Sequence, residues 1–341
     1  MAVTIYDVAR EAGVGIGTVS RAINNSSQIS PETRERVLQV IKRLNYQPHA
    51  VAQSLARRRT KTIACIIPFF SSYFYIELLR GIQRKITEHG YDLILYSVDL
   101  HHKKETFLRR ALQEKRVDGV FLVSMEIEPA FAKKFLDANF PIVLVDSFHP
   151  HLDSINVDNV EGAYRATNHL VSLGYRKIGM IDGQLKSLPA KLRLEGFRKA
   201  LAENGIPFQE RYFVACDFLD EADGFNKEAG YAAMQQLLAL GEDRPRAVFV
   251  SSDIQALGAI EAIREANLRV PQDIAVVGFD DVEISRYVGL TTIHQPIMEM
   301  GALAVDRLIE KIEGTASPEF KRRFQTELVV RESCGATMVS R

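Results

Sequence analysis

The chain has 341 residues, more than one hydrophobic core usually supports, so the length predicts two or three folded units. Apolar residues make up 46% of the chain and charged residues 25%, and no run of about 18 apolar residues indicates a membrane span. The three cysteines, Cys65, Cys216 and Cys334, are scattered along the chain. This excludes a disulfide framework or a paired-cysteine metal site and favours the cytoplasm, as does a start without the apolar core of a signal peptide.

The net charge of +0 conceals an uneven distribution. Residues 1–61 hold ten Lys or Arg and four Asp or Glu, a balance of +6. The 43 bases and 43 acids of the whole chain leave 33 and 39 for the remainder, a balance of −6. A basic head on an acidic body indicates that the head, and not the body, binds a polyanion.

The stretch GVGIGTVSRAIN, residues 13–24, is one residue short of a G-x-G-x-x-G dinucleotide loop. Such a loop must follow a buried strand. Thr4 and Asp7 instead form a capping-box pattern before apolar residues at helical spacing, so a helix precedes Gly13. We expect a second helix over residues 15–24 and a third that opens at Ser30-Pro31. Gly13 then supplies the turn of a helix-turn-helix.

Together with several further motifs, this head makes the chain resemble the LacI/GalR family of bacterial transcription regulators. The resemblance includes LNYQPHAVAQSLARRRT at residues 44–60 and the later stretches LVSLGYRKIGMI, VFVSSDIQALGAIEAI and VPQDIAVVGFDD, and it extends over essentially the whole chain. It implies a helix-turn-helix head on an α/β, periplasmic-binding-protein-like body of two doubly wound parallel-sheet lobes. The body is predicted independently as α/β, because strand-length apolar runs alternate with helical stretches from Thr62 onward.

Four parts follow from this organisation. We expect a helix-turn-helix DNA-binding domain at 1–47, and a hinge helix and linker at 48–61. The first lobe should comprise 62–158 with 293–321, and the second lobe 159–292 with 322–341. In this division the segment TTIHQP and its helix return to the first lobe, and the last strand lies in the second.

In a helix-turn-helix the second helix lies in the major groove of DNA. Arg21 is the residue that we expect to contact a guanine through two hydrogen bonds. Because Gly17 has no side chain to offer a base, Ile16 is expected to contact a thymine methyl. The predicted DNA-binding residues are Thr4, Ile5, Ile16, Gly17, Thr18, Ser20, Arg21, Asn24, His49, Ala52 and Leu55.

Ligands of open parallel sheets bind at the carboxyl ends of the strands, where polar residues collect in this chain. The predicted effector-binding residues are Phe70, Ser71, Phe74, Asp146, Arg193, Asp253 and Asp280. The resemblance implies that Arg193 and Asp280 bind hydroxyls or ring nitrogens of the effector. Asp253 has an alternative role as the cap of the helix that follows it, and we assign the same structural role to Asp182 and Asp281. The segment 68–75 is more aromatic than is usual in the family.

The sequence carries no P-loop, H-E-x-x-H or G-x-S-x-G motif, and its histidine pairs lack further metal ligands. We therefore expect no enzyme activity, no cofactor and no metal. The predicted function is a cytoplasmic, homodimeric repressor of a carbohydrate-utilisation operon that binds a pseudo-palindromic operator and is released by a sugar. The alternatives are a purine- or nucleoside-responsive regulator that needs its ligand as corepressor, and a regulator controlled by a partner protein.

Leu55→Ala tests the predicted hinge helix. The resemblance implies that Leu55 inserts between base pairs in the minor groove, so its truncation should weaken operator binding by more than about tenfold and leave effector binding unchanged. A gel-shift titration at fixed salt measures the difference. Equal affinities of the two proteins would contradict the role of Leu55.

Overall fold

The computed structural model describes residues 3–23, 26–46, 59–68, 72–98, 104–114, 116–217 and 224–336. The chain divides into two compact units, Met1–Thr60 and Lys61–Arg341. Six of the predicted site residues lie outside the described residues: Asn24, His49, Ala52, Leu55, Phe70 and Ser71. No helix among the described residues is long and apolar enough to cross a membrane.

The first unit contains the three predicted helices, α1 (Ile5–Ala12), α2 (Ile16–Ile23) and α3 (Pro31–Arg43). The capping box that begins α1 is present, because the Thr4 side chain and backbone N–H both pair with Asp7. Gly13 ends the helix with a left-handed φ of 65°, which an L side chain adopts only at a cost. The three helices pack around the fully buried Val8, Val19 and Val37. The helix-turn-helix prediction is confirmed.

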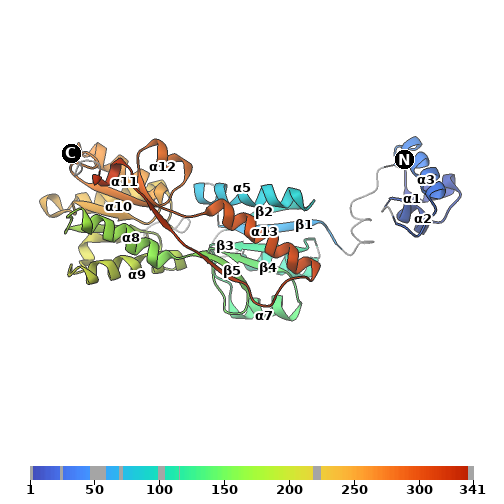
Figure 1. The fold of residues 1–341 in the computed structure, drawn as a ribbon, viewed down its shortest axis with the longest axis horizontal. Coiled ribbons are helices and arrows are strands. Elements are labelled where there is room, and N and C mark those ends of the chain that lie inside the picture. Colours follow the sequence, from blue (N-terminus) through green and yellow to red (C-terminus); the bar gives the residue numbers. More distant parts are fainter. Residues whose placement is uncertain are drawn as a thin grey trace. The chain divides into compact units, whose positions relative to one another are not determined.

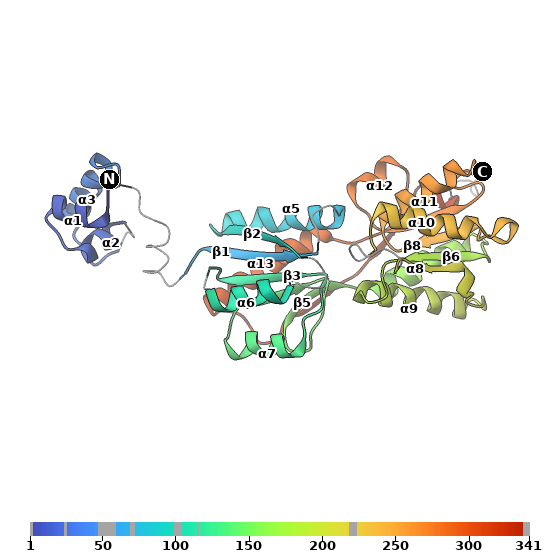
Figure 2. The ribbon, with the colours of Figure 1, turned by 180° about the vertical axis from the view of Figure 1, so that it is seen from behind.

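The second unit contains two parallel-sheet lobes (Figure 1). The first sheet has the order β11-β5-β4-β3-β1-β2, and all of its pairs are parallel. Its strands are β1 (Thr62–Ile67), β2 (Asp92–Ser97), β3 (Gly119–Val123), β4 (Ile142–Val145), β5 (Asp153–Val157) and β11 (Lys321–Phe324). Helices α5 (Tyr73–Glu88) and α13 (Ile297–Glu313) cover one face of this sheet. Helices α6 (Lys104–Glu114) and α7 (Pro129–Asp137) cover the other face (Figure 2).

The second sheet repeats this arrangement with the order β12-β10-β9-β8-β6-β7. Its strands are β6 (Ile178–Asp182), β7 (Phe213–Ala215), β8 (Ala247–Val250), β9 (Ala275–Asp280), β10 (Thr291–His294) and β12 (Glu327–Val329), of which β12 is antiparallel to β10. Helices α8 (Asn159–Ser172) and α9 (Leu188–Glu203) cover one face. Helices α10 (Lys227–Leu238) and α11 (Asp253–Glu265) cover the other, and the short α12 (Glu283–Tyr287) follows β9. The predicted pair of doubly wound lobes is confirmed.

The lobes are connected differently from the prediction near the C-terminal end. Strand β10 lies in the second sheet beside β9, so placing 293–294 and the TTIHQP strand in the first lobe was wrong. Only the helix after it, α13, returns to the first lobe, where it packs on α5. Strand β11 extends to Phe324 and pairs with β5, so placing 322–324 in the second lobe was also wrong. The reason is that Lys321–Phe324, sequence KRRF, forms an edge strand without the apolar run that marks a buried one.

A buried ion pair fixes this returning strand in the first lobe. Arg307 of α13 donates from Nε to Asp153 Oδ2 of β5 at 2.8 Å, and both side chains are almost fully buried. Asp153 also accepts from the backbone N–H of Phe320, just before β11, at 3.1 Å. Burial alone would raise the pKa of Asp153, but its bonds with Arg307 and Lys311 outweigh burial and lower the pKa from its ordinary 3.8.

Asp153→Ala should destabilise the second unit by about 3–5 kcal/mol, because the buried Arg307 loses its buried counter-charge and keeps only the half-exposed Glu310, 2.9 Å from its Nη1. Urea unfolding at neutral pH measures the loss. Asp137→Ala is the control, because Asp137 pairs with Lys133 on the exposed face of α7 in the same lobe, and little change is expected there. The lowered pKa means that the stabilisation from Asp153 is complete above pH 3.8 and is lost as the pH falls through the lowered value. If Asp153→Ala and Asp137→Ala lost the same free energy of unfolding, the buried pair of Asp153 and Arg307 would not stabilise the first lobe as described.

Candidate DNA-binding surface and effector site

The exposed side of α2 carries three of the predicted DNA-binding residues. Ile16 is 40% exposed, and Gly17 and Arg21 are exposed as well, whereas Val19 and Ala22 on the opposite side are buried. A Cβ at Gly17 would meet no atom within 4 Å, so the helix surface is open there. Arg21 forms no ion pair with the described residues. Its guanidinium is therefore available to a ligand.

The remaining predicted residues of the head that the structure describes belong to α2, to α1 and to the cap of α1. Thr18 and Ser20 of α2 are half-buried, and so is Ile5 at the start of α1. Thr4 is exposed, but its hydroxyl already donates to Asp7 Oδ2 at 2.7 Å as part of the cap. Tyr6, next to Ile5, is 69% exposed and was not among the residues predicted from the sequence. A large aromatic on the polar side of an amphipathic helix was the signal that could have found it.

A polar cavity lies between the two lobes at the carboxyl ends of their strands. The space between its lining residues, open solvent included, is about 430 Å³. Four of the predicted effector residues line it: Phe74, Asp146, Arg193 and Asp280. The other lining residues are Ser72, Tyr75, Ser124, Ser187, Pro189, Phe225, Ser252 and Ile254. The first lobe contributes Phe74 from α5 and Asp146 after β4, and the second contributes Arg193 from α9 and Asp280 from β9.

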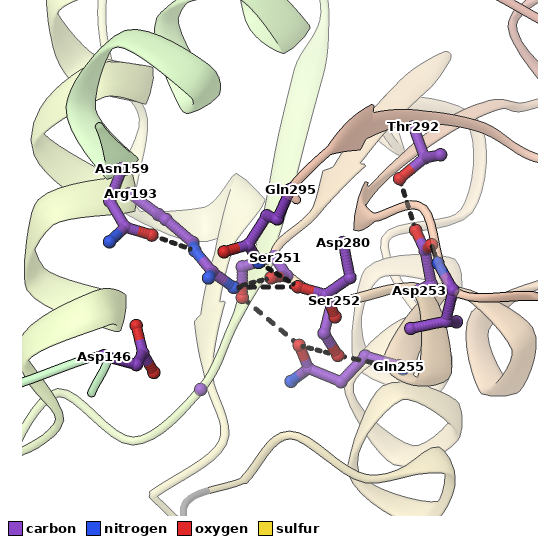
Figure 3. A network of polar contacts seen from close by, with 12 residues as sticks. Asp146, Asn159, Arg193, Ser251, Ser252, Asp253, Gln255, Asp280, Thr292 and Gln295 are labelled. Carbon is purple, nitrogen blue, oxygen red and sulfur yellow. Dashed lines mark hydrogen bonds and ion pairs between the residues drawn. The ribbon is translucent and has the colours of Figure 1, made fainter. Parts of the chain in front are cut away.

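Arg193 is the central cation of this cavity and is only 4% exposed. Its Nε donates to Asn159 Oδ1 at 2.8 Å, and its Nη1 donates to the carbonyl of Ser251. Figure 3 shows the guanidinium between Asn159 and Asp280, and Asp280 Oδ1 lies 3.9 Å from Nη1. The guanidinium also lies over two aromatic rings, 3.9 Å from the centroid of Phe279 and 5.5 Å from that of Phe225.

Both carboxylates of the cavity stand at strand ends with left-handed backbone. Asp146 has a φ of 51° and Asp280 a φ of 122°, a conformation that non-glycine residues adopt at a cost and that is common at functional sites. Asp146 Oδ2 accepts from Ser124 Oγ at 2.8 Å, and Asp280 Oδ1 accepts from Gln295 Nε2 at 2.6 Å. Burial raises the pKa of Asp280 well above its ordinary value, and Arg193 opposes that shift.

Asp253 does not line the cavity, and its proposed capping role is also incorrect. Ser252 is the cap of α11, since its side chain accepts from the backbone of Gln255 at 3.2 Å. Asp253 is fully buried and accepts from Ser285 Oγ at 2.6 Å, Thr292 Oγ1 at 2.5 Å and the backbone N–H of Val282 at 3.1 Å. It therefore ties α11 to α12 and β10. Burial raises its pKa to about 7 in spite of these donors.

The two other aspartates that were assigned structural roles are held within the second lobe, but not as simple caps. Asp281 accepts from Arg331 Nη2 at 2.6 Å and lies 3.1 Å from His294 Nδ1. Asp182, at the end of β6, accepts from the backbone of Gly183 at 2.8 Å, and burial raises its pKa to about 7. Neither residue lines the cavity.

Three residues of the site were not identified from the sequence. Gln295 is buried and donates from Nε2 to Asp280, and the acceptor of its side chain, Oε1, has no hydrogen-bond partner among the described residues. Gln255 donates to the carbonyls of Asp182 and Gly224 and so holds the segment before Phe225. Phe225 lines the cavity from the second lobe. Their roles depend on contacts across the fold that no local pattern reveals.

The lining of the cavity determines what it can bind. It presents one guanidinium, two carboxyl groups, four serine hydroxyls and three aromatic rings, of which that of Tyr75 carries a fifth hydroxyl. Since the cation is outnumbered by carboxylates and already engaged, the cavity suits a neutral ligand with several hydroxyls better than an anion. No group of three or more His, Cys, Asp or Glu side chains in the described part of the chain could hold a metal ion.

Comparison with known proteins finds a matching family for each of the two units. Residues 4–49 match the family described as bacterial regulatory proteins, lacI family, and residues 167–334 match the periplasmic binding protein-like domain. The chain is 40% identical to the ribose operon repressor of Escherichia coli K12 over 91% of its own length and 93% of that protein.

Two solved structures extend the comparison. A lac repressor dimer bound to operator and an anti-inducer superimposes with a TM-score of 0.83 at 32% identity, covering 98% of this chain and 99% of that one. The complex of the transcriptional regulator CelR with cellobiose gives a TM-score of 0.72 at 32% identity, covering 97% and 99%.

Asp253→Ala and Asp146→Ala separate a structural from a ligand-binding carboxylate. Asp253→Ala leaves three buried donors unsatisfied, at about 1–3 kcal/mol each, and should destabilise the second unit strongly. Asp146→Ala should cost about 1 kcal/mol of stability and weaken effector binding instead. Urea unfolding and calorimetric titration of the folded variants measure the two effects. If the two variants lost effector affinity equally, Asp253 would belong to the binding site.

Proposed function

Because the chain belongs to the lacI family of bacterial regulatory proteins, a family of DNA-binding transcriptional regulators, we propose that it represses a carbohydrate-utilisation operon and is released by a neutral sugar. The head binds a pseudo-palindromic operator as a homodimer, and the cavity between the lobes binds the effector. Such a protein works in the cytoplasm, where the bacterial chromosome lies, and acts by binding rather than by catalysis.

The observation that supports a sugar most directly is the position of Arg193 among Asp280, Asp146 and the cavity hydroxyls. A guanidinium and carboxylates can together orient donor and acceptor hydroxyls of a polyol, and charged partners make such bonds strong. Phe74, Tyr75 and Phe225 provide apolar faces for the C–H surface of a sugar ring. The related repressor named for ribose and the regulator bound to cellobiose support the same class of ligand.

The site also supports a mechanism for release. Since the effector would contact Asp146 in one lobe and Arg193 and Asp280 in the other, its binding energy depends on how the lobes are placed. An effector shifts the protein toward the non-binding state only by the difference between its affinities for the two states. Operator affinity then falls by the same factor by which the operator weakens effector binding.

On the DNA side, α2 carries the specificity. We propose that Arg21 contacts a guanine, that Ile16 contacts a thymine methyl, and that Thr4, Ile5, Thr18 and Ser20 contact the backbone. The exposure of Ile16, Gly17 and Arg21 on one side of this helix supports that assignment.

A thermal-shift screen against neutral sugars, phosphosugars, nucleobases and nucleosides tests the effector class. A neutral sugar at about 100 times its Kd should stabilise the protein by about 2.7 kcal/mol. Arg193→Lys should abolish the shift because lysine lacks the planar fork, whereas Arg198→Lys, on the exposed side of the same helix, should preserve it. The effective sugar should also release operator DNA in a gel shift at fixed salt. A response to nucleobases or to phosphosugars alone would overturn the proposal.

A further inference from the structure

A second cavity shares part of its wall with the central one. Its space, open solvent included, is about 740 Å³. The residues that line both cavities are Ser124, Asp146, Ser187 and Pro189. We call this second space the side cavity, and the other residues that line it are Lys104, Met125, Glu126, Ser147, Lys186 and Leu188. Because the two spaces meet along a common wall, a single elongated molecule can occupy both.

The side cavity, like the central one, lies between the lobes. The first lobe lines it with Lys104 at the start of α6 and with the segments that follow β3 and β4. The second lobe lines it with residues 186–189, which lie between the end of β6 and the first turn of α9. Arg193 and Asp280 line only the central cavity. A ligand in the side cavity would therefore contact both lobes at a second place.

The charges of the side cavity favour a neutral ligand. Two lysines and two acids line it: Lys104, Lys186, Glu126 and Asp146. Lys104 is already engaged, since its Nζ donates to the carbonyl of Glu126 at 2.9 Å and stands 3.4 Å from Glu105 Oε1. The exposed side chains of Lys186 and Glu126 form no ion pair with the described residues. A hydroxyl group suits both, because it accepts from an ammonium and donates to a carboxylate.

The rest of the wall carries the apolar and hydroxyl groups that a sugar ring contacts. Leu188 and Pro189 of α9 offer aliphatic carbon to the C–H surface of a ring. On the first lobe, Ser147 and Met125 are almost fully buried, and Ser147 Oγ donates to the carbonyl of Met125 at 2.6 Å. This bond joins the segment after β4 to the segment after β3 and holds that wall in place.

From this arrangement we propose that the effector is a neutral disaccharide, with its first ring in the central cavity and its second ring in the side cavity. The inference rests on the proposed function of a sugar-released repressor and adds the length of the sugar. The first ring binds Arg193 and Asp280. The second ring accepts from Lys186, donates to Glu126 and packs on Leu188. The residues common to both cavities lie at the glycosidic linkage.

Isothermal titration calorimetry on the full chain tests the length of the sugar. The probes are the monosaccharides glucose, galactose and xylose, and the disaccharides cellobiose, maltose, lactose, melibiose and xylobiose. We expect one of the disaccharides to bind at least about tenfold more tightly than each monosaccharide that it contains, because its second ring adds hydrogen bonds to charged groups. The same disaccharide should release operator DNA in a gel shift at a lower concentration than its monosaccharides.

Lys186→Ala and Glu126→Ala locate the second ring. Each should weaken the disaccharide by about tenfold and leave its monosaccharides within about twofold, because a single ring in the central cavity does not reach either side chain. Lys191→Ala is the matched control, since Lys191 is an exposed lysine of α9 that lines neither cavity, and it should bind like the wild type. All three substitutions change exposed side chains, and melting temperatures show that the variants are folded.

The outcomes separate this inference from the proposed function. If the monosaccharides bound as tightly as the disaccharides that contain them, the second ring would have no site, and the proposed function would stand. The same holds if Lys186→Ala and Glu126→Ala bound the disaccharide like Lys191→Ala. If none of the sugars bound, or if only nucleobases or phosphosugars did, the proposed function would fail together with the inference.

Discussion

The burial of one guanidinium governs how the effector site is built. Removing a charge from water costs several kcal/mol, and the cost is recovered only if the charge is paired and its donors are satisfied. Arg193 meets this requirement through Asn159 of α8, the carbonyl of Ser251 after β8, and Asp280 at the end of β9. It thus determines which groups must converge at the strand ends of the second lobe, and Gln295 then has to hold Asp280 in turn.

The two lobes contribute unequally to the cavity. The second lobe supplies the buried cation and one carboxylate, whereas the first supplies Asp146, hydroxyls and the rings of Phe74 and Tyr75. A ligand that satisfied only Arg193 and Asp280 would bind equally well whatever the position of the first lobe, and it would shift no equilibrium. The residues of the first lobe therefore decide whether a bound molecule is an effector, although the second lobe provides most of the charge.

The sequence was most informative where a local pattern alone determines the structure. Apolar runs located most strands of the two sheets, and the carboxyl ends of those strands located Asp146 and Asp280. The predictions failed where the outcome depends on distant partners. KRRF becomes a strand only because β5 has a free edge beside it, and Asp253 is held by Ser285 and Thr292, which are 32 and 39 residues away. Gln255 and Gln295 have no local signature at all.

Asn159 ties the effector site to the connection between the lobes, because it stands at the first turn of α8, where the chain crosses from the first lobe into the second. Its Oδ1 accepts from Arg193 Nε at 2.8 Å. A change of this connection that displaced Asn159 would remove a hydrogen bond from a buried guanidinium and would raise the free energy of the site without effector. The position of Arg193 is therefore bound to the geometry of the segment that joins the two lobes.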